Sequence, residues 1–165
     1  MEEQSVVQST KYVTFVSGGE CYGIKIDYVN EIIVYQDITS VPETEDYIMG
    51  LINLRGKIIP VVDVRRRFRQ EPIEYTDRTC IIVISVYSTV VGLIVEKIAE
   101  VVEIMDTDIL PSPTIGGDKN DRRFVQAIGK VGDSVKLLLD PDKLLNDEEL
   151  ARVEQIEKTD TEKGE

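Results

Sequence analysis

The residue of this sequence best placed for recognition chemistry is an arginine at the tip of a predicted β-hairpin. Arg55 and Gly56 separate two short apolar runs, residues 50–54 and 58–62, and this pattern predicts a strand, a tight turn and a second strand. The guanidinium of arginine is a planar donor that matches a carboxylate in shape and charge. We therefore hypothesise that Arg55 bridges a surface acid, with Glu31 favoured, and presents a fixed edge to a partner. The alternative is a solvated turn residue, because exposed charges are common.

Residues suited to catalysis are scarce. The chain contains no histidine, which removes the commonest general base and the commonest metal ligand. It has no Gly-rich phosphate loop, no nucleophile elbow and no zinc-ligand spacing. Residues 116–121 gather oxygen ligands but lack the terminal glutamate of a calcium loop, so we interpret them as part of a mobile loop. We predict a protein that is not an enzyme and has no metal or cofactor. The alternative left open is a hydrolase that uses a pair of Asp or Glu side chains.

Two further groups have side chains that bind ligands in other proteins. The basic cluster consists of Arg65, Arg66, Arg67 and Arg69. A solvated helix face is the favoured interpretation of this cluster, and a site for phosphate or an acidic partner is the alternative. Cys21 and Cys80 lie in apolar, strand-like runs, and we predict free, buried thiols, as expected in a reducing cytosol.

The composition favours a globular protein with an acidic surface. With 165 residues, 42% of them apolar, the chain is long enough to bury a real core. Its formal net charge of −12 opposes binding to nucleic-acid phosphates or anionic lipid. No apolar run approaches the length of a transmembrane helix, and the acidic, polar N-terminus does not resemble a signal peptide. We therefore expect a cytoplasmic protein that binds no nucleic acid and does not insert directly into the membrane.

An internal repeat organises the predicted strands. Residues 23–33 match residues 92–102 at an offset of 69, which also pairs the acids Glu31 and Glu100. A second match, residues 61–63 with 138–140, has an offset of 77. Because the second offset is larger by eight, we place an insertion of that length in residues 114–123. Short strands and tight turns repeated at this spacing predict two small β-barrels that share a core.

The boundaries follow from the repeat and the apolar pattern. We expect one domain over residues 11–150, with approximate subdomains 11–78 and 79–146. Apolar residues near helical spacing predict a C-terminal helix over residues 147–157. Residues 158–165 lack apolar anchors, and we expect them and residues 1–10 to be flexible tails.

A set of motifs connects these features to a known family. The run INLRG at residues 52–56 is followed by PVVD at 60–63, GLIVE at 92–96 and DPDKLL at 140–145. In this order and spacing, the motifs resemble those of the CheW family, the small adaptor proteins of bacterial chemotaxis. The resemblance covers roughly residues 11–150. It implies a mainly β fold of two SH3-like five-stranded β-barrels packed side by side, with short helices.

The resemblance also implies a function. It suggests a signalling adaptor that couples chemoreceptors (methyl-accepting chemotaxis proteins) to the histidine kinase CheA, and that is recruited to membrane receptor arrays through these partners. The cytoplasmic hairpin tip of a chemoreceptor would occupy the groove between the barrels, and the regulatory domain of CheA would bind another face of the first barrel. An adaptor of the same fold in a different receptor-linked histidine kinase pathway is the alternative.

The candidate partner-binding residues are carried over from the family by position. They are Ile26, Val29, Glu31, Gly50, Asn53, Leu54, Arg55, Ile58 and Cys80. For the apolar members Ile26, Val29 and Ile58, and for Cys80, a core position is the alternative interpretation. For Gly50, the alternative is a role in backbone shape alone.

Overall fold

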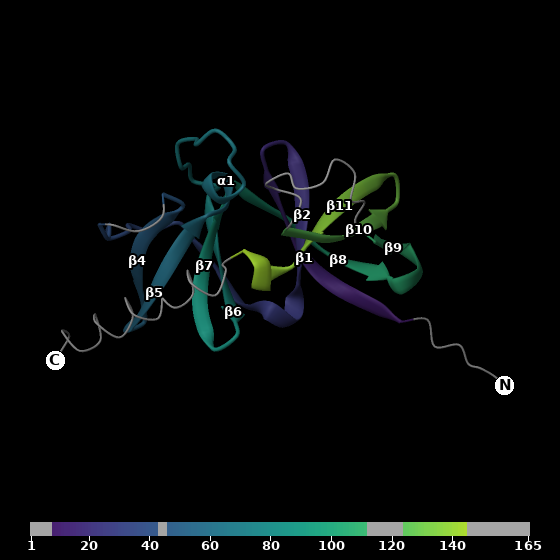
Figure 1. Ribbon diagram of the computed structural model, residues 1–165, viewed down its shortest axis with the longest axis horizontal. Helices are drawn as coiled ribbons and strands as arrows, with labels where there is room; N and C mark the ends of the chain where they lie inside the picture. The colour runs from purple at the N-terminus through teal and green to yellow at the C-terminus, as the bar shows by residue number, and fades with distance from the viewer. Residues whose placement is uncertain (1–7, 43–45, 112–123, 145–165) are drawn as a thin grey trace.

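Two mainly antiparallel sheets lie side by side and make up most of the molecule (Figure 1). The computed structural model describes residues 8–42, 46–111 and 124–144. The sheet on the right of Figure 1, called sheet A here, has six strands, and sheet B on the left has five. The prediction of a mainly β fold built from two barrel-like units is therefore confirmed.

Sheet A draws its strands from both ends of the chain. In spatial order it contains β8 (Lys97–Met105), β1 (Ser9–Ser17), β2 (Glu20–Lys25), β11 (Ser134–Leu139), β10 (Val125–Val131) and β9 (Ile109–Pro111). The resemblance implied five strands, and the three-residue β9 at the edge is the additional one. The strand β1 begins at Ser9, so the expected flexible tail of residues 1–10 is wrong for Ser9 and Thr10, which pair with β8.

Sheet B is formed by the middle of the chain. Its spatial order is β3 (Val29–Val34), β6 (Cys80–Val86), β7 (Thr89–Val95), β5 (Lys57–Asp63) and β4 (Ile48–Leu54). Short helices follow several of the strands: η1 (Ile26–Tyr28), α1 (Val64–Arg67), η2 (Asp106–Asp108) and η4 (Pro141–Lys143). The predicted C-terminal helix 147–157, the inserted loop 114–123 and the tail 158–165 lie outside the described residues.

The two halves of the repeat exchange strands. The first hairpin, β1–β2, belongs to sheet A, whereas β3, β4 and β5 of the same half belong to sheet B. The second hairpin, β6–β7, belongs to sheet B, whereas the later strands of its half, β8 to β11, belong to sheet A. The expected contiguous subdomains 11–78 and 79–146 therefore do not correspond to the sheets, because local sequence pattern contains no information on which distant strand is the pairing partner.

Strand register confirms the repeat itself. Gly23 lies opposite Thr14 in the antiparallel hairpin and opposite Leu138 in the parallel pair. Gly92 lies opposite Val83 and Val61 in the same two kinds of pairing. These partners are related by the same offsets of 69 and 77 residues that the sequence shows. The two repeat segments therefore occupy equivalent settings, related by an approximate two-fold.

Three apolar clusters form the interior. One fills sheet B around Ile59 and Ile81, and a smaller one fills sheet A around Ile104 and Leu138. The largest lies between the sheets and takes Phe15 from β1 of sheet A together with residues of sheet B. This shared cluster confirms the prediction of a common core and agrees with the small surface that either barrel could bury alone.

Candidate partner-binding site

The predicted hairpin carries Arg55 at its tip. Arg55 has a φ of 53° and Gly56 a φ of 87°, and two consecutive positive φ values are what a type I′ turn needs to match the twist of its strands. Asn53 stabilises this turn, because its Oδ1 accepts a hydrogen bond of 2.8 Å from the backbone N–H of Gly56. A bulky residue in the left-handed region is uncommon, so the turn holds Arg55 at some conformational cost.

The hypothesised ion pair between Arg55 and Glu31 is present in the structure. It joins the tip of the β4–β5 hairpin to β3, and β3 and β4 are the two opposite edge strands of sheet B. The backbone carbonyl of Asn53 accepts a hydrogen bond of 3.2 Å from Gln36 Nε2 across the same gap. These contacts draw the two edges of sheet B together. They leave 68% of the Arg55 side chain exposed, so a partner can still reach its guanidinium.

A β-bulge determines which face of sheet B each side chain of β3 lies on. The register with β6 shifts between Val29 and Glu31, and one extra residue in a strand reverses the alternation of its side chains. Val29, Ile32 and Val34 consequently lie opposite β6 residues that face the shared core, whereas Glu31 faces the barrel interior near Arg55. A register shift occurs at the equivalent place between β1 and β8.

The margin of the shared core is uncovered along β3. Ile32 is 39% exposed and Val34 is 71% exposed, and Val34 lies directly opposite Cys80. Val29 and Cys80 are half-buried and pack against the shared core. We call this set, Val29, Ile32, Val34 and Cys80, the β3 strip. Ile32 and Val34 were missed by the sequence reasoning, since the run VNEIIV gives no sign that β3 is an edge strand.

The remaining predicted residues separate by role. Ile26 is 38% exposed at η1, so it is a surface residue and not a core residue. Leu54 packs into sheet B, and Ile58 is half-buried opposite Asn53. Gly50 is buried with a φ of 145°, and a Cβ there would lie 2.0 Å from the carbonyl oxygen of Thr39. Gly50 therefore serves backbone shape, which was the alternative interpretation.

The arginines of the basic cluster are used mainly inside the molecule. Arg67 is buried, and Arg65 Nη1 lies 3.0 Å from Glu96 Oε1. Arg66 Nε lies 3.9 Å from Asp63 Oδ2. Asp63 also caps α1, because its Oδ1 accepts a hydrogen bond of 2.9 Å from the Arg65 backbone N–H. Among these four residues, Arg69 is the one classed as exposed. The predicted solvated helix face and the alternative phosphate site therefore both fail for the cluster as a whole, because Arg65, Arg66 and Arg67 contact other residues of the protein.

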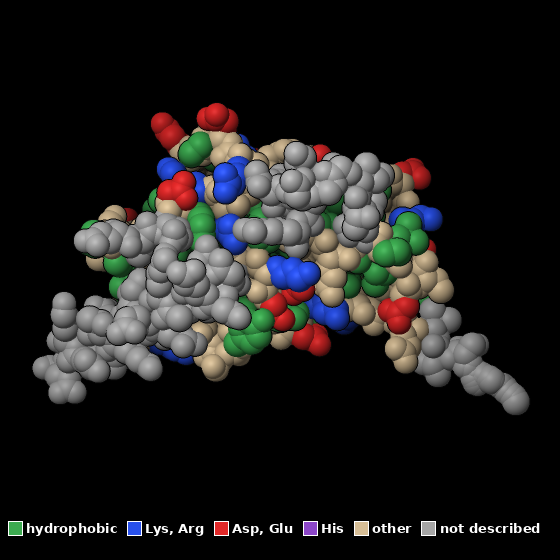
Figure 2. All heavy atoms as spheres, viewed as in Figure 1, with side chains coloured by type: hydrophobic (Ala, Val, Ile, Leu, Met, Phe, Trp, Pro, Cys, Tyr) green, Lys and Arg blue, Asp and Glu red, His purple; other side chains and the backbone are tan. Residues whose placement is uncertain are grey.

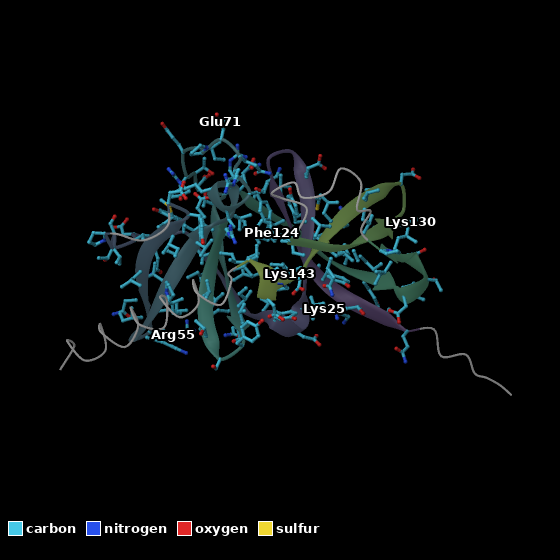
Figure 3. The ribbon with its side chains drawn as sticks, in the orientation of Figure 1. Lys25, Arg55, Glu71, Phe124, Lys130 and Lys143 are labelled. Atoms are coloured by element: carbon cyan, nitrogen blue, oxygen red, sulfur yellow. The ribbon has the colours of Figure 1, made fainter. Side chains whose placement is uncertain are left out.

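The charged surface is mixed on the face that Figure 2 shows. Lys and Arg side chains lie near its middle, and acidic side chains surround them. Lys25 and Lys143 are among the central basic residues, whereas Arg55 lies at the lower end of sheet B (Figure 3). Cys21 and Cys80 are free thiols, each half-buried. Within the described ranges, no cluster of His, Cys, Asp and Glu side chains could hold a metal ion.

Two barrel-like sheets that share one core define a double-barrel β domain. A family model described as CheW-like domain matches residues 11–149. The chain therefore belongs to the CheW family.

Relatives of known name support this membership. The chain is 34% identical to a chemotaxis protein CheW of Klebsiella aerogenes over 90% of this chain and 89% of the relative. It is 33% identical to a chemotaxis protein CheW of Bacillus subtilis over 83% of this chain and 88% of the relative. The crystal structure of the scaffolding protein TtCheW from Thermoanaerobacter tengcongensis superposes with a TM-score of 0.79 at 34% identity, covering 86% of this chain and 96% of TtCheW. None of the helices in the described part of the chain is long and apolar enough to cross a membrane.

Proposed function

We propose that this protein is a non-enzymatic adaptor that couples chemoreceptors to the histidine kinase CheA. The observation that carries the proposal is the Arg55–Glu31 pair at the end of sheet B, together with the β3 strip on the opposite face of the same edge strand. Exposed apolar side chains and a charged anchor on an edge strand are features by which surfaces recognise helices and strand edges. Membership of a scaffolding family supports the same assignment.

The two partners use different surfaces in this proposal. The cytoplasmic hairpin tip of the chemoreceptor lies in the groove between the two sheets and contacts both of them. The regulatory domain of CheA binds sheet B, near the hairpin that carries Arg55. The adaptor works in the cytoplasm and reaches membrane receptor arrays by binding these partners.

The test replaces Arg55 by asparagine. Asparagine tolerates the left-handed conformation at this turn, so Arg55→Asn removes the guanidinium and keeps the hairpin. The ion pair is exposed, so the free energy of unfolding in urea should change by less than ~1 kcal/mol. Calorimetric titration with a receptor cytoplasmic fragment and with the CheA regulatory domain should show ~2–5 kcal/mol weaker binding to at least one of them, because the complex leaves Glu31 buried and unpaired.

A second arginine provides the matched control. Arg69 is also exposed, and its φ of 61° is close to that of Arg55. Arg69→Asn should leave both affinities unchanged. Wild-type protein that binds neither partner contradicts the adaptor assignment. Unchanged binding by Arg55→Asn removes Arg55 from the site, and additive losses in Arg55→Asn with Glu31→Gln show that the two residues act separately.

A further inference from the structure

The segments that meet between the two sheets are equivalent to one another in the repeat. Asp63 and Asp140 cap equivalent short helices, since each side-chain Oδ1 accepts a backbone N–H of the following turn. The backbone N–H of Asp63 donates to the carbonyl of Tyr47 at 2.8 Å, and that of Asp140 donates to the carbonyl of Phe124 at 2.9 Å. Tyr47 and Phe124 are therefore equivalent aromatic residues, one in each half.

Arg67 lies between these two equivalent rings. Its guanidinium carbon is 4.5 Å from the centroid of Tyr47 and 4.6 Å from that of Phe124. Its Nε donates a hydrogen bond to the carbonyl of Leu144. Leu144 follows Asp140 by the same four positions by which Arg67 follows Asp63, so the acceptor belongs to the residue equivalent to Arg67 itself. Arg67 thus occupies the approximate two-fold, where each half contributes one ring.

This junction is almost completely removed from solvent. The exposed fraction is 6% for Arg67, 7% for Tyr47 and 1% for both Phe124 and Leu144. Figure 3 shows Phe124 in the middle of the molecule, between the sheets. Two aromatic faces offset part of the cost of burying the guanidinium charge. Removing the guanidinium would end that cost, but it would also take a hydrogen-bond donor from the buried carbonyl of Leu144.

The physical difference between arginine and an apolar residue at this position is geometric. A flat guanidinium between two rings fixes the spacing of the rings and their tilt, and its directional N–H bond fixes a third point. An aliphatic chain fills the volume but accepts many arrangements of the same neighbours. The Tyr47 ring moves with sheet B and the Phe124 ring with sheet A, so constraining the two rings constrains the angle between the sheets.

We propose that Arg67 is a positioning residue that sets the angle between the two sheets and thereby the relative position of their surfaces. The consequence for binding rests on the proposed function, in which the receptor tip contacts both sheets and the kinase domain contacts sheet B. Loss of Arg67 should therefore weaken receptor binding and leave kinase binding unchanged, because only the receptor surface depends on the angle.

The experiment compares Arg67→Met with wild type in isotopically labelled full-length protein. Residual dipolar couplings of the amides in β1–β2 and β4–β5 report the orientation of each sheet separately. In Arg67→Met, each sheet should fit its own wild-type geometry, while the orientation between them changes or becomes averaged. The melting temperature should fall by about 10 °C or less, since methionine fills a similar volume but the Leu144 carbonyl loses its donor. Binding to a receptor cytoplasmic fragment should weaken about tenfold, because the groove is no longer preorganised, with binding to the CheA regulatory domain unchanged.

Arg66→Met is the control, because Arg66 is on the same helix but contacts Asp63 within its own half. It should leave the orientation at the wild-type value. If Arg67→Met does not fold, Tyr47→Leu and Arg67→Lys replace it. Both variants weaken the contacts of Arg67 with the two rings and Leu144 less severely, and the same couplings are measured on them. A wild-type orientation of the sheets in every folded variant of Arg67 and Tyr47 overturns the proposal. An equal loss of affinity for the receptor fragment and for the CheA regulatory domain also overturns it. The couplings need no partner, so failure of wild-type protein to bind a receptor would count against the proposed function alone.

Discussion

At the scale of the residue, Asn53 controls how Arg55 is presented. Its side chain ties the hairpin turn by accepting the Gly56 N–H, and its own backbone carbonyl contacts Gln36. Asn53→Ala should destabilise the protein by about 1 kcal/mol in urea unfolding, the typical value of one net hydrogen bond. Asn53→Asp keeps an acceptor at the same place and should retain most of that stability. Equal losses in the two variants would show that the side-chain acceptor has no role in the turn.

Tyr75 provides a residue-scale prediction about pH. Burial, the 2.6 Å hydrogen bond to Asp63 Oδ2 and the negative charge of Asp63 raise the pKa of Tyr75 above its ordinary value of 10.0. The neutral hydroxyl is therefore favoured in the folded state, and its contribution is complete below pH 10.0 and is lost as the pH rises further. Urea unfolding measured between neutral and alkaline pH should show stability falling above that value.

The matching variant is Tyr75→Phe, which keeps the ring contact with Tyr35. It should lower stability at neutral pH by about 1–3 kcal/mol, because the buried carboxylate of Asp63 loses a donor. Its stability should then fall less steeply at alkaline pH than that of wild type. An identical slope in both proteins would assign the alkaline loss to other tyrosines.

At the scale of the element, the equivalent strands β2 and β7 each need a glycine where a parallel neighbour crosses closely. A Cβ on Gly92 would lie 2.8 Å from Val61 Cγ1 and 2.8 Å from Ile81 Cγ2. On Gly23, the nearest atom would be Leu138 Cδ2 at 3.1 Å, the end of a longer and more adaptable side chain. Both repeats therefore favour glycine at this position, but the site of Gly23 should accept a Cβ more easily than that of Gly92.

These contacts predict an order of stability for two matched variants. Gly92→Ala should destabilise the protein by about 1–3 kcal/mol through overpacking, and Gly23→Ala by less than ~1 kcal/mol. Chemical unfolding of the two purified variants measures the difference directly. A larger loss in Gly23→Ala would mean that the equivalent packing around β2 and β7 does not determine the cost.

At the scale of the whole molecule, the exchange of hairpins makes each half dependent on the other. In a fragment of residues 1–78, β3 loses its neighbour β6 and β5 loses its neighbour β7. The hairpin β1–β2 likewise loses β8 and β11. A two-stranded hairpin is at best marginally stable alone, so neither sheet can form in the fragment.

We expect the 1–78 fragment to show no cooperative thermal transition by circular dichroism. Mixing it with a fragment of residues 79–165 should restore β structure and a complex of one copy of each, because together they supply every strand of both sheets. The intact chain is the reference for the restored spectrum. Cooperative unfolding of monomeric 1–78 fragment would contradict the interdependence of the halves.

The local features of this protein were predictable from sequence because neighbouring residues determine them. The Arg55–Gly56 turn depends on the conformations that its own residues adopt, and the N-cap at Asp63 on the next helical turn. The repeat of about 70 residues was visible because residues 21–24 of β2 and 90–93 of β7 have the same pattern of buried positions. Of the site around Arg55, the hairpin followed from this local pattern, whereas the candidate partner-binding residues were carried over from the family by position.

What the tertiary structure decided were the pairings between distant segments. The exposure of Ile32 and Val34 follows from β3 being an edge strand with a bulge, and the burial of Arg67 follows from Tyr47 and Phe124 meeting across the approximate two-fold. The exchange of hairpins between sheets has the same origin. Non-local pairing is chosen by the free energy of the complete core, to which strands far apart in sequence contribute together, and a strand's own residues show only which of its faces is apolar.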